Sequence, residues 1–188
     1  SLNMKEASFT SKFESADKAS IEYTYYSLRQ MPFTVLMDVT ITAKKDIVLG
    51  AASVMEAPDA LKEVQNYYNE IDRPHVVVSL LTSTAKSPTG KLQMCASNTF
   101  LFSETHGQEP RVIHEMWDNN MHLMKFSKKL KAGSSYRFSI VGSSITSAHH
   151  DDPLNEAERM TIFAKLEGRE RLIEHHKNAW RSEEHTSE

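Results

Sequence analysis

Residues 34–42 read Thr-Val-Leu-Met-Asp-Val-Thr-Ile-Thr, and one set of apolar side chains in this segment recurs at every second position. Val35, Met37, Val39 and Ile41 form that set. Successive side chains of a β-strand point to opposite faces of the sheet, so the alternation predicts a strand with one buried face. We expect the face that carries these four residues to be buried.

Similar segments lie on both sides of this one and are separated by turn-forming residues such as Ser87-Pro88-Thr89-Gly90. The predicted strands cover residues 8–14, 21–26, 47–51, 75–84, 92–102, 111–126 and 136–145. Residues 57–74 interrupt the series as a long polar excursion that includes Tyr67 and Tyr68. Many strands joined by turns predict a mainly β protein, a large antiparallel β-sandwich.

The pattern changes to a helical one after Asp151. Asp152 suits the N-cap of a helix, and Pro153 suits its first position. Apolar residues then follow helical spacing, namely Leu154, Ala157, Met160, Ala164, Leu172 and Ile173. Gly168 is a weak point in this segment. We therefore predict one long helix or two broken helices, outside the sandwich pattern.

The second half of this helical segment is expected to lack a partner. We predict that residues 154–164 pack on the sandwich and that Arg169–Trp180 is frayed or exposed, because isolated helices are marginally stable in water. In that case Leu172, Ile173 and Trp180 would lack a full set of contacts.

The last eight residues differ from everything before them. Arg181–Glu188 contains no apolar residue and resembles the translation of a common sequencing-library adapter. A natural polar terminus is the alternative. We expect residues 181–188 to be adapter read-through, with Ser182–Glu188 holding no defined structure.

The composition excludes several classes of protein. The 188 residues carry a net charge of −3, with 39% hydrophobic and 25% charged residues, which is ordinary for a globular domain. The basic residues are scattered, so we expect no nucleic-acid partner. No run of about 18 apolar residues occurs, so we expect no membrane partner. Cys95 is the single cysteine, so an internal disulfide cannot form.

Two pairs of adjacent histidines are candidate metal ligands. His149-His150 precedes Asp151-Asp152, but neighbouring residues diverge rather than converge on one ion, so a polar loop before a helix is the preferred interpretation. His175 and His176 are neighbours on a predicted helix and point about 100° apart, so we expect them at the surface. We predict no metal site and no cofactor.

Residues 114–118, His-Glu-Met-Trp-Asp, are the candidate catalytic segment. Glycoside cleavage requires two carboxyl groups at a defined separation, and Glu115 with Asp118 could supply them. Strand alternation places these two on opposite faces, however. Trp117 could stack on a sugar ring or belong to the core. We therefore predict no catalytic residue in this chain.

Four segments resemble glycoside hydrolase family 65. They are Leu2–Thr10 and Ile21–Arg29 near the start, and Leu154–Arg159 and His175–Trp180 in the helical part. The resemblance spans nearly all of residues 1–180. It implies that residues 1–150 are the enzyme's N-terminal domain, a galactose-mutarotase-like supersandwich that is incomplete at its start. It also implies a helical linker at residues 151–180 that leads to a missing (α/α)6 catalytic barrel.

The resemblance also implies a function for the parent protein. Members of this family are inverting hydrolases or phosphorylases of α-linked disaccharides, and their general acid lies in the barrel. This chain would therefore be an inactive, non-catalytic fragment of such an enzyme. The implied partners are the carbohydrate substrate in the intact enzyme, the barrel in cis, and a second copy in a homodimer. Because a family member of this kind can carry an export signal, a periplasmic or extracellular location is favoured over a cytoplasmic one.

Two other functions remain open at this stage. One is a free-standing carbohydrate-binding sandwich. The other is the sandwich domain of a different (α/α)6-barrel hydrolase, such as a rhamnosidase-like enzyme. The helical segment favours a domain of a larger enzyme, because an autonomous module would not need about 25 helical residues at its end.

Overall fold

The computed structural model describes residues 1–118 and 121–184, and it describes side chains as far as Arg181. The strands are β1 Leu2–Asn3, β2 Ser8–Glu14, β3 Ala19–Ser27, β4 Thr34–Ala43, β5 Ile47–Glu56, β6 Lys62–Arg73, β7 Val76–Lys86, β8 Gln93–Phe102, β9 Ile113–Met116, β10 Met121–Leu130 and β11 Ser135–Thr146. Two helices follow, α1 Pro153–Glu167 and α2 Arg169–Glu184. The mainly β architecture predicted from the sequence is confirmed.

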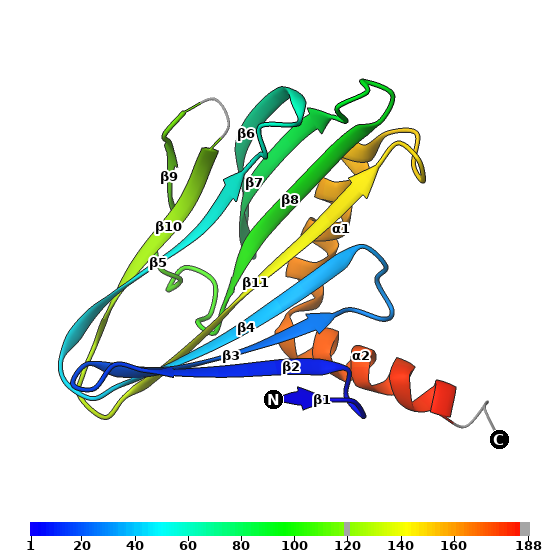
Figure 1. Cartoon of the computed structure of the whole chain (residues 1–188). Helices are drawn as coiled ribbons and strands as arrows, with labels where there is room; N and C mark the ends of the chain where they lie inside the picture. The colour runs from blue at the N-terminus through cyan, green and yellow to red at the C-terminus, as the bar shows by residue number, and fades with distance from the viewer. Residues whose placement is uncertain (119–120, 185–188) are drawn as a thin grey trace.

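The strands form two antiparallel sheets of unequal width (Figure 1). The large sheet has eight strands in the order β1-β2-β3-β4-β11-β8-β7-β6, and the small sheet has three, in the order β5-β10-β9. Strand β4 passes through a short turn into β5, so the chain crosses from one sheet to the other at that point. The small sheet therefore faces only part of the large one.

The main core lies between the two sheets. Val39 and Ile41 are buried there, as predicted, and Met37 is half-buried. Val35 remains 46% exposed, so the prediction was wrong for this residue. Its side chain shares the inner face of β4 with the other three, but it borders an open groove that Ala52 and Val54 of β5 also line.

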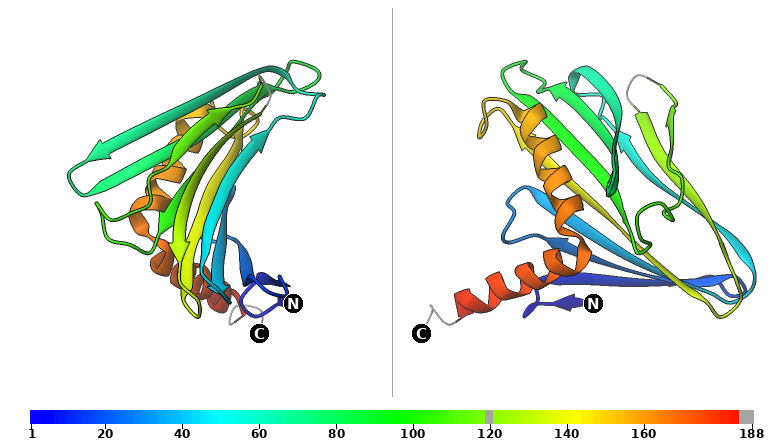
Figure 2. Two further views of the ribbon diagram at one scale, coloured as in Figure 1. Left: turned by 90° about the vertical axis from the view of Figure 1, so that its left-hand side faces the viewer. Right: turned by 180° about the vertical axis from the view of Figure 1, so that it is seen from behind.

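The two helices cover the opposite face of the large sheet (Figure 2). Helix α1 packs across β7, β8 and β11. A second cluster lies beneath the helices and contains Leu36, Val141, Ala164 and Leu172, among others. Strand β4 is consequently covered on both faces over most of its length, which explains why Leu36 is fully buried although it alternates with the core residues.

The start of α1 and the break between the helices follow the sequence signals. Asp152 is the N-cap, and one of its carboxylate oxygens accepts a hydrogen bond from the Asn155 amide at 3.1 Å. Gly168 ends α1 with a φ of 79°, a left-handed conformation that favours glycine. Of the two alternatives, the chain forms two helices rather than one.

The prediction that residues 169–180 are frayed or exposed was wrong, because they belong to α2 and one side of this helix is buried. The expected lack of partners holds in part for Trp180, whose buried indole nitrogen has no hydrogen-bond partner among the described residues. Leu172 is 1% exposed, and its carbonyl accepts a hydrogen bond from the Gln30 side chain at 2.9 Å. His176 is fully buried, accepts from the Arg29 amide at 3.1 Å and lies 3.0 Å from the Glu6 carbonyl. The β3–β4 turn and the β1–β2 segment therefore supply partners that helical spacing alone could not reveal.

Three other boundaries differ from the predictions. Residues 57–74 contain the edge strand β6 rather than an irregular excursion, and residues 111–126 divide into β9 and the first part of β10. Helix α2 continues to Glu184, so residues 182–184 are helical and the prediction of no defined structure was wrong for them. Residues 185–188 lie outside the described part of the chain. Neither described helix is long and apolar enough to cross a membrane.

Candidate functional site

The candidate catalytic segment lies on β9 and the turn that follows it. Glu115 forms an ion pair with Lys125 of β10, and this partner lowers the pKa of the Glu115 carboxyl below its ordinary value. Asp118 lies after the end of β9 and accepts a hydrogen bond from the Met121 amide at 2.8 Å. Both carboxylates therefore have structural partners, and Asp118 lies outside strand β9 rather than on a strand face.

Trp117 lies at the same end of the small sheet and is 64% exposed. Of the two predicted roles, a place in the core is excluded. Its indole nitrogen lies 3.4 Å from a Glu115 carboxylate oxygen. An exposed indole ring of this kind offers a flat apolar surface with one polar edge.

His114 takes part in a polar network that the sequence did not predict. Its ring stacks on Tyr68 at a centroid distance of 4.6 Å, and its Nε2 atom lies 3.3 Å from Nδ1 of His122. Nε2 of His122 lies 2.9 Å from the Ser83 hydroxyl, which donates to the Asn66 carbonyl oxygen at 2.8 Å. The network thus joins β6 and β7 of the large sheet to β9 and β10 of the small sheet.

The sequence did contain a signal for His122. In β10 this residue alternates with Met124 and Phe126, both of which are buried in the core between the sheets. A histidine at an inward position of a strand must find hydrogen-bond partners inside the protein. Its partner Ser83 occupies an inward position on β7 in the same way, two residues after the buried Leu81.

Burial determines the charge of this network. Burial, with a smaller contribution from the neighbouring His114, lowers the pKa of His122 to about 4. Burial also lowers the pKa of His114. Both rings are therefore neutral at pH 7. The described members of the network are two imidazoles, a hydroxyl, an amide and Tyr68, so the network contains no carboxyl pair of the kind that glycoside inversion uses.

The buried His122 should make the stability of the protein depend on pH. Between its ordinary pKa of 6.5 and the folded value of about 4, the unfolded chain binds a proton that the folded chain does not. The contribution of neutral His122 to the free energy of unfolding is therefore fully present above pH 6.5 and is lost as the pH decreases toward 4. The free energy of unfolding should be about 2–3 kcal/mol lower at pH 4.5 than at pH 7.

Urea unfolding at these two pH values checks this prediction. The His122→Gln variant should lose most of the pH-dependent difference, whereas the same change at the exposed His175 serves as the control. If His122→Gln keeps the pH dependence of the original protein, His122 is not the group that causes it.

Three of the four paired histidines contact other residues of the protein, namely His149, His150 and His176. His149 stacks on Phe33 at 5.3 Å, and His150 packs edge-on against the same ring at 6.1 Å. His175 is exposed, as predicted, but His176 is fully buried, and the prediction of a surface position was wrong for it. Within the described residues, no group of three or more potential ligands is arranged to hold a metal ion.

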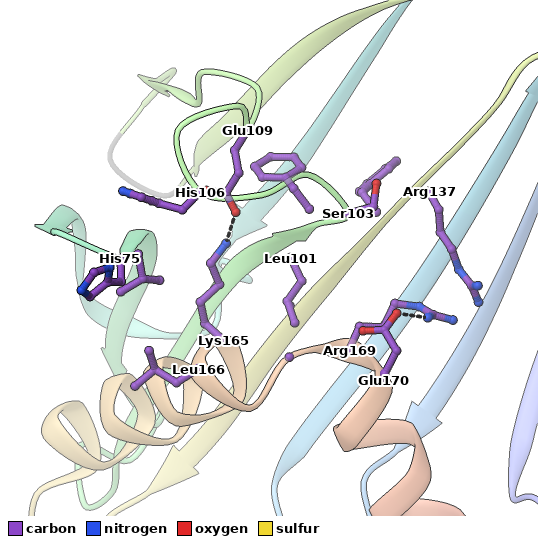
Figure 3. Close-up of a pocket in the computed structure, with 14 residues that line it drawn as sticks. His75, Leu101, Ser103, His106, Glu109, Arg137, Lys165, Leu166, Arg169 and Glu170 are labelled. Atoms are coloured by element: carbon purple, nitrogen blue, oxygen red, sulfur yellow. Dashed lines mark hydrogen bonds and ion pairs between the residues drawn. The ribbon is translucent and has the colours of Figure 1, made fainter.

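A cleft lies at the junction of α1 and α2 (Figure 3). It has a volume of about 370 Å³ and is bordered by the β8–β9 loop, the end of α1 and the start of α2. Lys165 pairs with Glu109 at 3.0 Å, and Arg169 pairs with Glu170 at 2.7 Å. Arg169 also contacts Asp38 at 2.7 Å. Asp38 also pairs with Arg137, so three carboxylates balance three cations around the cleft, and the cleft does not favour a charged ligand.

Comparison with known proteins gives two close relatives of this chain, and no family model matches it. It is 66% identical over 179 residues to a protein named kojibiose hydrolase from Mucilaginibacter mallensis, and 44% identical over 181 residues to a protein of that name from Flavobacterium johnsoniae. The matches cover 95% and 96% of this chain but 26% and 27% of the relatives. The chain thus spans about a quarter of the length of these curated relatives.

A solved structure has the same fold as this chain. A protein from the human microbiome, described as a kojibiose phosphorylase, superposes with a TM-score of 0.71 at 8% sequence identity. The superposition covers 96% of this chain and 24% of that protein. At this identity the likeness concerns the fold, and it confirms the predicted sandwich with its helical extension.

Proposed function

Because this chain is related to glycoside hydrolase family 65 over 95% of its residues, we propose that it is the non-catalytic β-sandwich domain and helical linker of a longer disaccharide-acting enzyme. In this proposal residues 1–150 form the sandwich domain, residues 151–180 form the linker, and residues 181–188 are adapter read-through. The chemistry takes place in a catalytic domain that the parent protein carries in cis.

The 66% identity to a protein named kojibiose hydrolase carries this proposal. Identity of this size over 179 residues favours a shared role for this domain in both proteins. It also favours hydrolysis over phosphorolysis for the parent enzyme, and kojibiose as its substrate. The remaining three quarters of the relatives provide ample length for a catalytic domain.

The contacts of the carboxylates support a non-catalytic role. Asp38, Glu109 and Glu115 each form an ion pair within the domain. Inversion needs one protonated carboxyl group and one carboxylate about 6.5–9.5 Å apart, with room for the substrate and a water molecule between them. The candidate pair Glu115 and Asp118 meets this requirement poorly, because the first is held by Lys125 and the second accepts a hydrogen bond from the Met121 amide.

The experiment compares the complete gene product with the 188-residue chain. Glucose release from kojibiose is measured for both proteins, with maltose and trehalose as comparison substrates, in the presence and absence of inorganic phosphate. The complete protein should release glucose from kojibiose without phosphate, and the chain alone should show no turnover above background.

Two results would contradict the proposal. Turnover by the chain alone that is lost when a carboxylate within residues 1–180 is replaced would place catalysis in this domain. A complete protein that cleaves none of the three disaccharides would remove the proposed function. A strict requirement for phosphate would assign the enzyme to the phosphorolytic class instead.

A further inference from the structure

One edge of the small sheet lacks the protection that the other edges have. Strand β5 pairs only with β10, so its other side presents unpaired backbone groups. Residues 47–55 contain no charged residue and no proline. Exposed edges of this length usually carry lysines, prolines or bulges that prevent further pairing.

The other three described edges are protected or short. Strand β6 carries charged residues at both ends and an irregularity between Lys62 and Gln65. Strand β1 has two residues, and β9 has four. Of these described edges, β5 is therefore the long one that has neither charged residues along positions 47–55 nor a register irregularity.

An apolar surface lies beside this edge, on the inner face of the large sheet. Phe9, Tyr25, Met37 and Ile140 are neighbours in register across β2, β3, β4 and β11. Phe9 is 46% exposed and Tyr25 is 40% exposed. Phe13 and Ile21 continue this face at 55% and 37% exposure. We call this surface, together with Val35, the inner apolar face.

A groove runs between the inner apolar face and the edge of β5. It has a volume of about 340 Å³. Val35 and Met37 of β4 line it on the side of the large sheet, and Ala52 and Val54 line it on the side of β5. Figure 1 shows β5 leaving the turn it shares with β4 and lying apart from β3 and β2. Gly142 also lines the groove, where an added Cβ atom would lie 2.9 Å from the Asn98 Cβ atom.

We propose that an extended polypeptide strand from the same parent protein docks in this groove, pairs with β5 and covers the inner apolar face. An added strand supplies alternating N–H and C=O groups for the open edge, and its alternate side chains meet the apolar floor. The added strand would widen the small sheet toward β3 and β2. The three strands of the small sheet leave these two strands of the large sheet uncovered. This inference rests on the proposed function, because it needs a longer parent chain.

The groove fits a polypeptide better than a sugar. Apart from Tyr25, its polar side chains are Ser53 and Asn98, which bond to each other at 3.1 Å, so the groove offers few polar groups to a carbohydrate. The length of the relatives favours a segment in cis, because about three quarters of each lies outside the matched region. A covalently linked segment also binds at a high effective concentration.

A photo-crosslinking experiment on the complete gene product tests the proposal. p-Benzoylphenylalanine replaces Tyr25 in the groove, and it replaces Tyr67 on the outer edge strand β6 as the matched control, since the two tyrosines are 40% and 37% exposed. Mixing protein labelled with ¹⁴N and ¹⁵N distinguishes links within one molecule from links between two. Position 25 should give an intramolecular link to a segment outside these 188 residues, and position 67 should not.

Hydrogen exchange provides an independent measure of strand pairing. Amides of residues 51–54 should exchange roughly tenfold or more slowly in the complete protein than in the isolated chain. In the complete protein, Val35→Lys should remove this protection and lower the Tm by roughly 5 °C or more, since it places a charge beneath the docked strand. Ile113→Lys is the control, because Ile113 lies on β9 and is 49% exposed. It should leave the amide protection of residues 51–54 and the Tm unchanged.

Several outcomes would overturn the proposal. A link only to a second copy would identify a dimer interface instead, and no link above the control would leave the groove open to solvent. Equal exchange of β5 amides in both proteins would exclude strand addition. Glucose release is measured on the same unmodified protein, so a protein that links as proposed but cleaves no disaccharide would contradict only the proposed function.

Discussion

Replacing Asp38 with alanine should lower the free energy of unfolding by about 3–5 kcal/mol, the loss expected when one partner of a buried ion pair is removed. The Asp38 side chain is 5% exposed and accepts hydrogen bonds from Arg137, Ser139 and Arg169. It therefore holds the first residue of α2 against the centre of the large sheet. Without the carboxylate, the Arg169 guanidinium stays largely buried with fewer partners and the α1–α2 junction loses its attachment.

Chemical denaturation followed by circular dichroism measures this loss. Asp46→Ala is the matched control, because Asp46 pairs with Lys131 at the surface and exposed pairs contribute at most about 1 kcal/mol. Asp38→Asn keeps the shape of the side chain and removes its charge, so it separates loss of charge from loss of packing. If Asp38→Ala and Asp46→Ala have equal stability, the bridge to α2 contributes nothing measurable.

Replacing Phe126 with alanine should destabilise the sandwich by about 3–5 kcal/mol, because a large cavity forms between the two sheets. Phe126 belongs to the small sheet and is 2% exposed. Its ring lies edge-on to Phe100, Phe102 and Phe138 of the large sheet at centroid distances of 5.1, 4.9 and 5.0 Å. Edge-to-face pairs of this kind add to the energy of burial.

This loss is comparable to the whole stability of many single domains, so we expect Phe126→Ala to unfold at a much lower urea concentration or to be recovered in poor yield. Phe163→Ala is the control, since that ring is 49% exposed on the outer side of α1. A Phe126→Ala protein as stable as Phe163→Ala would show that the aromatic cluster does not hold the sheets together.

Local sequence determined the elements of this protein and much of the class of fold. Alternation in residues 34–42 predicted β4, and Asp152 with Pro153 marked the start of α1. Gly168 marked the weak point at which α1 ends. These signals are reliable because they depend on geometry within a few residues: a strand repeats every two positions, and a helix end needs its own cap.

The candidate site was less accessible from the sequence. Sequence adjacency made His114–Asp118 and the histidine pairs the candidate sites. The network in the structure instead joins His114 to His122 and Ser83. These residues lie on three strands of two sheets. Only the inward position of His122, between apolar neighbours on β10, indicated that a buried polar partner was needed.

The tertiary structure alone decided which faces are covered. Val35 and Val39 follow the same alternation in one strand, yet the first is 46% exposed and the second is 6% exposed, because Val35 borders the open groove beside β5 whereas Val39 lies in the core between the sheets. Conversely, Leu172 and His176 follow a helical pattern that indicated no partner, and they are buried by Gln30, Arg29 and Glu6, more than 140 positions away. Periodicity specifies the direction of a side chain relative to its own backbone, but burial depends on which distant segment packs against that side.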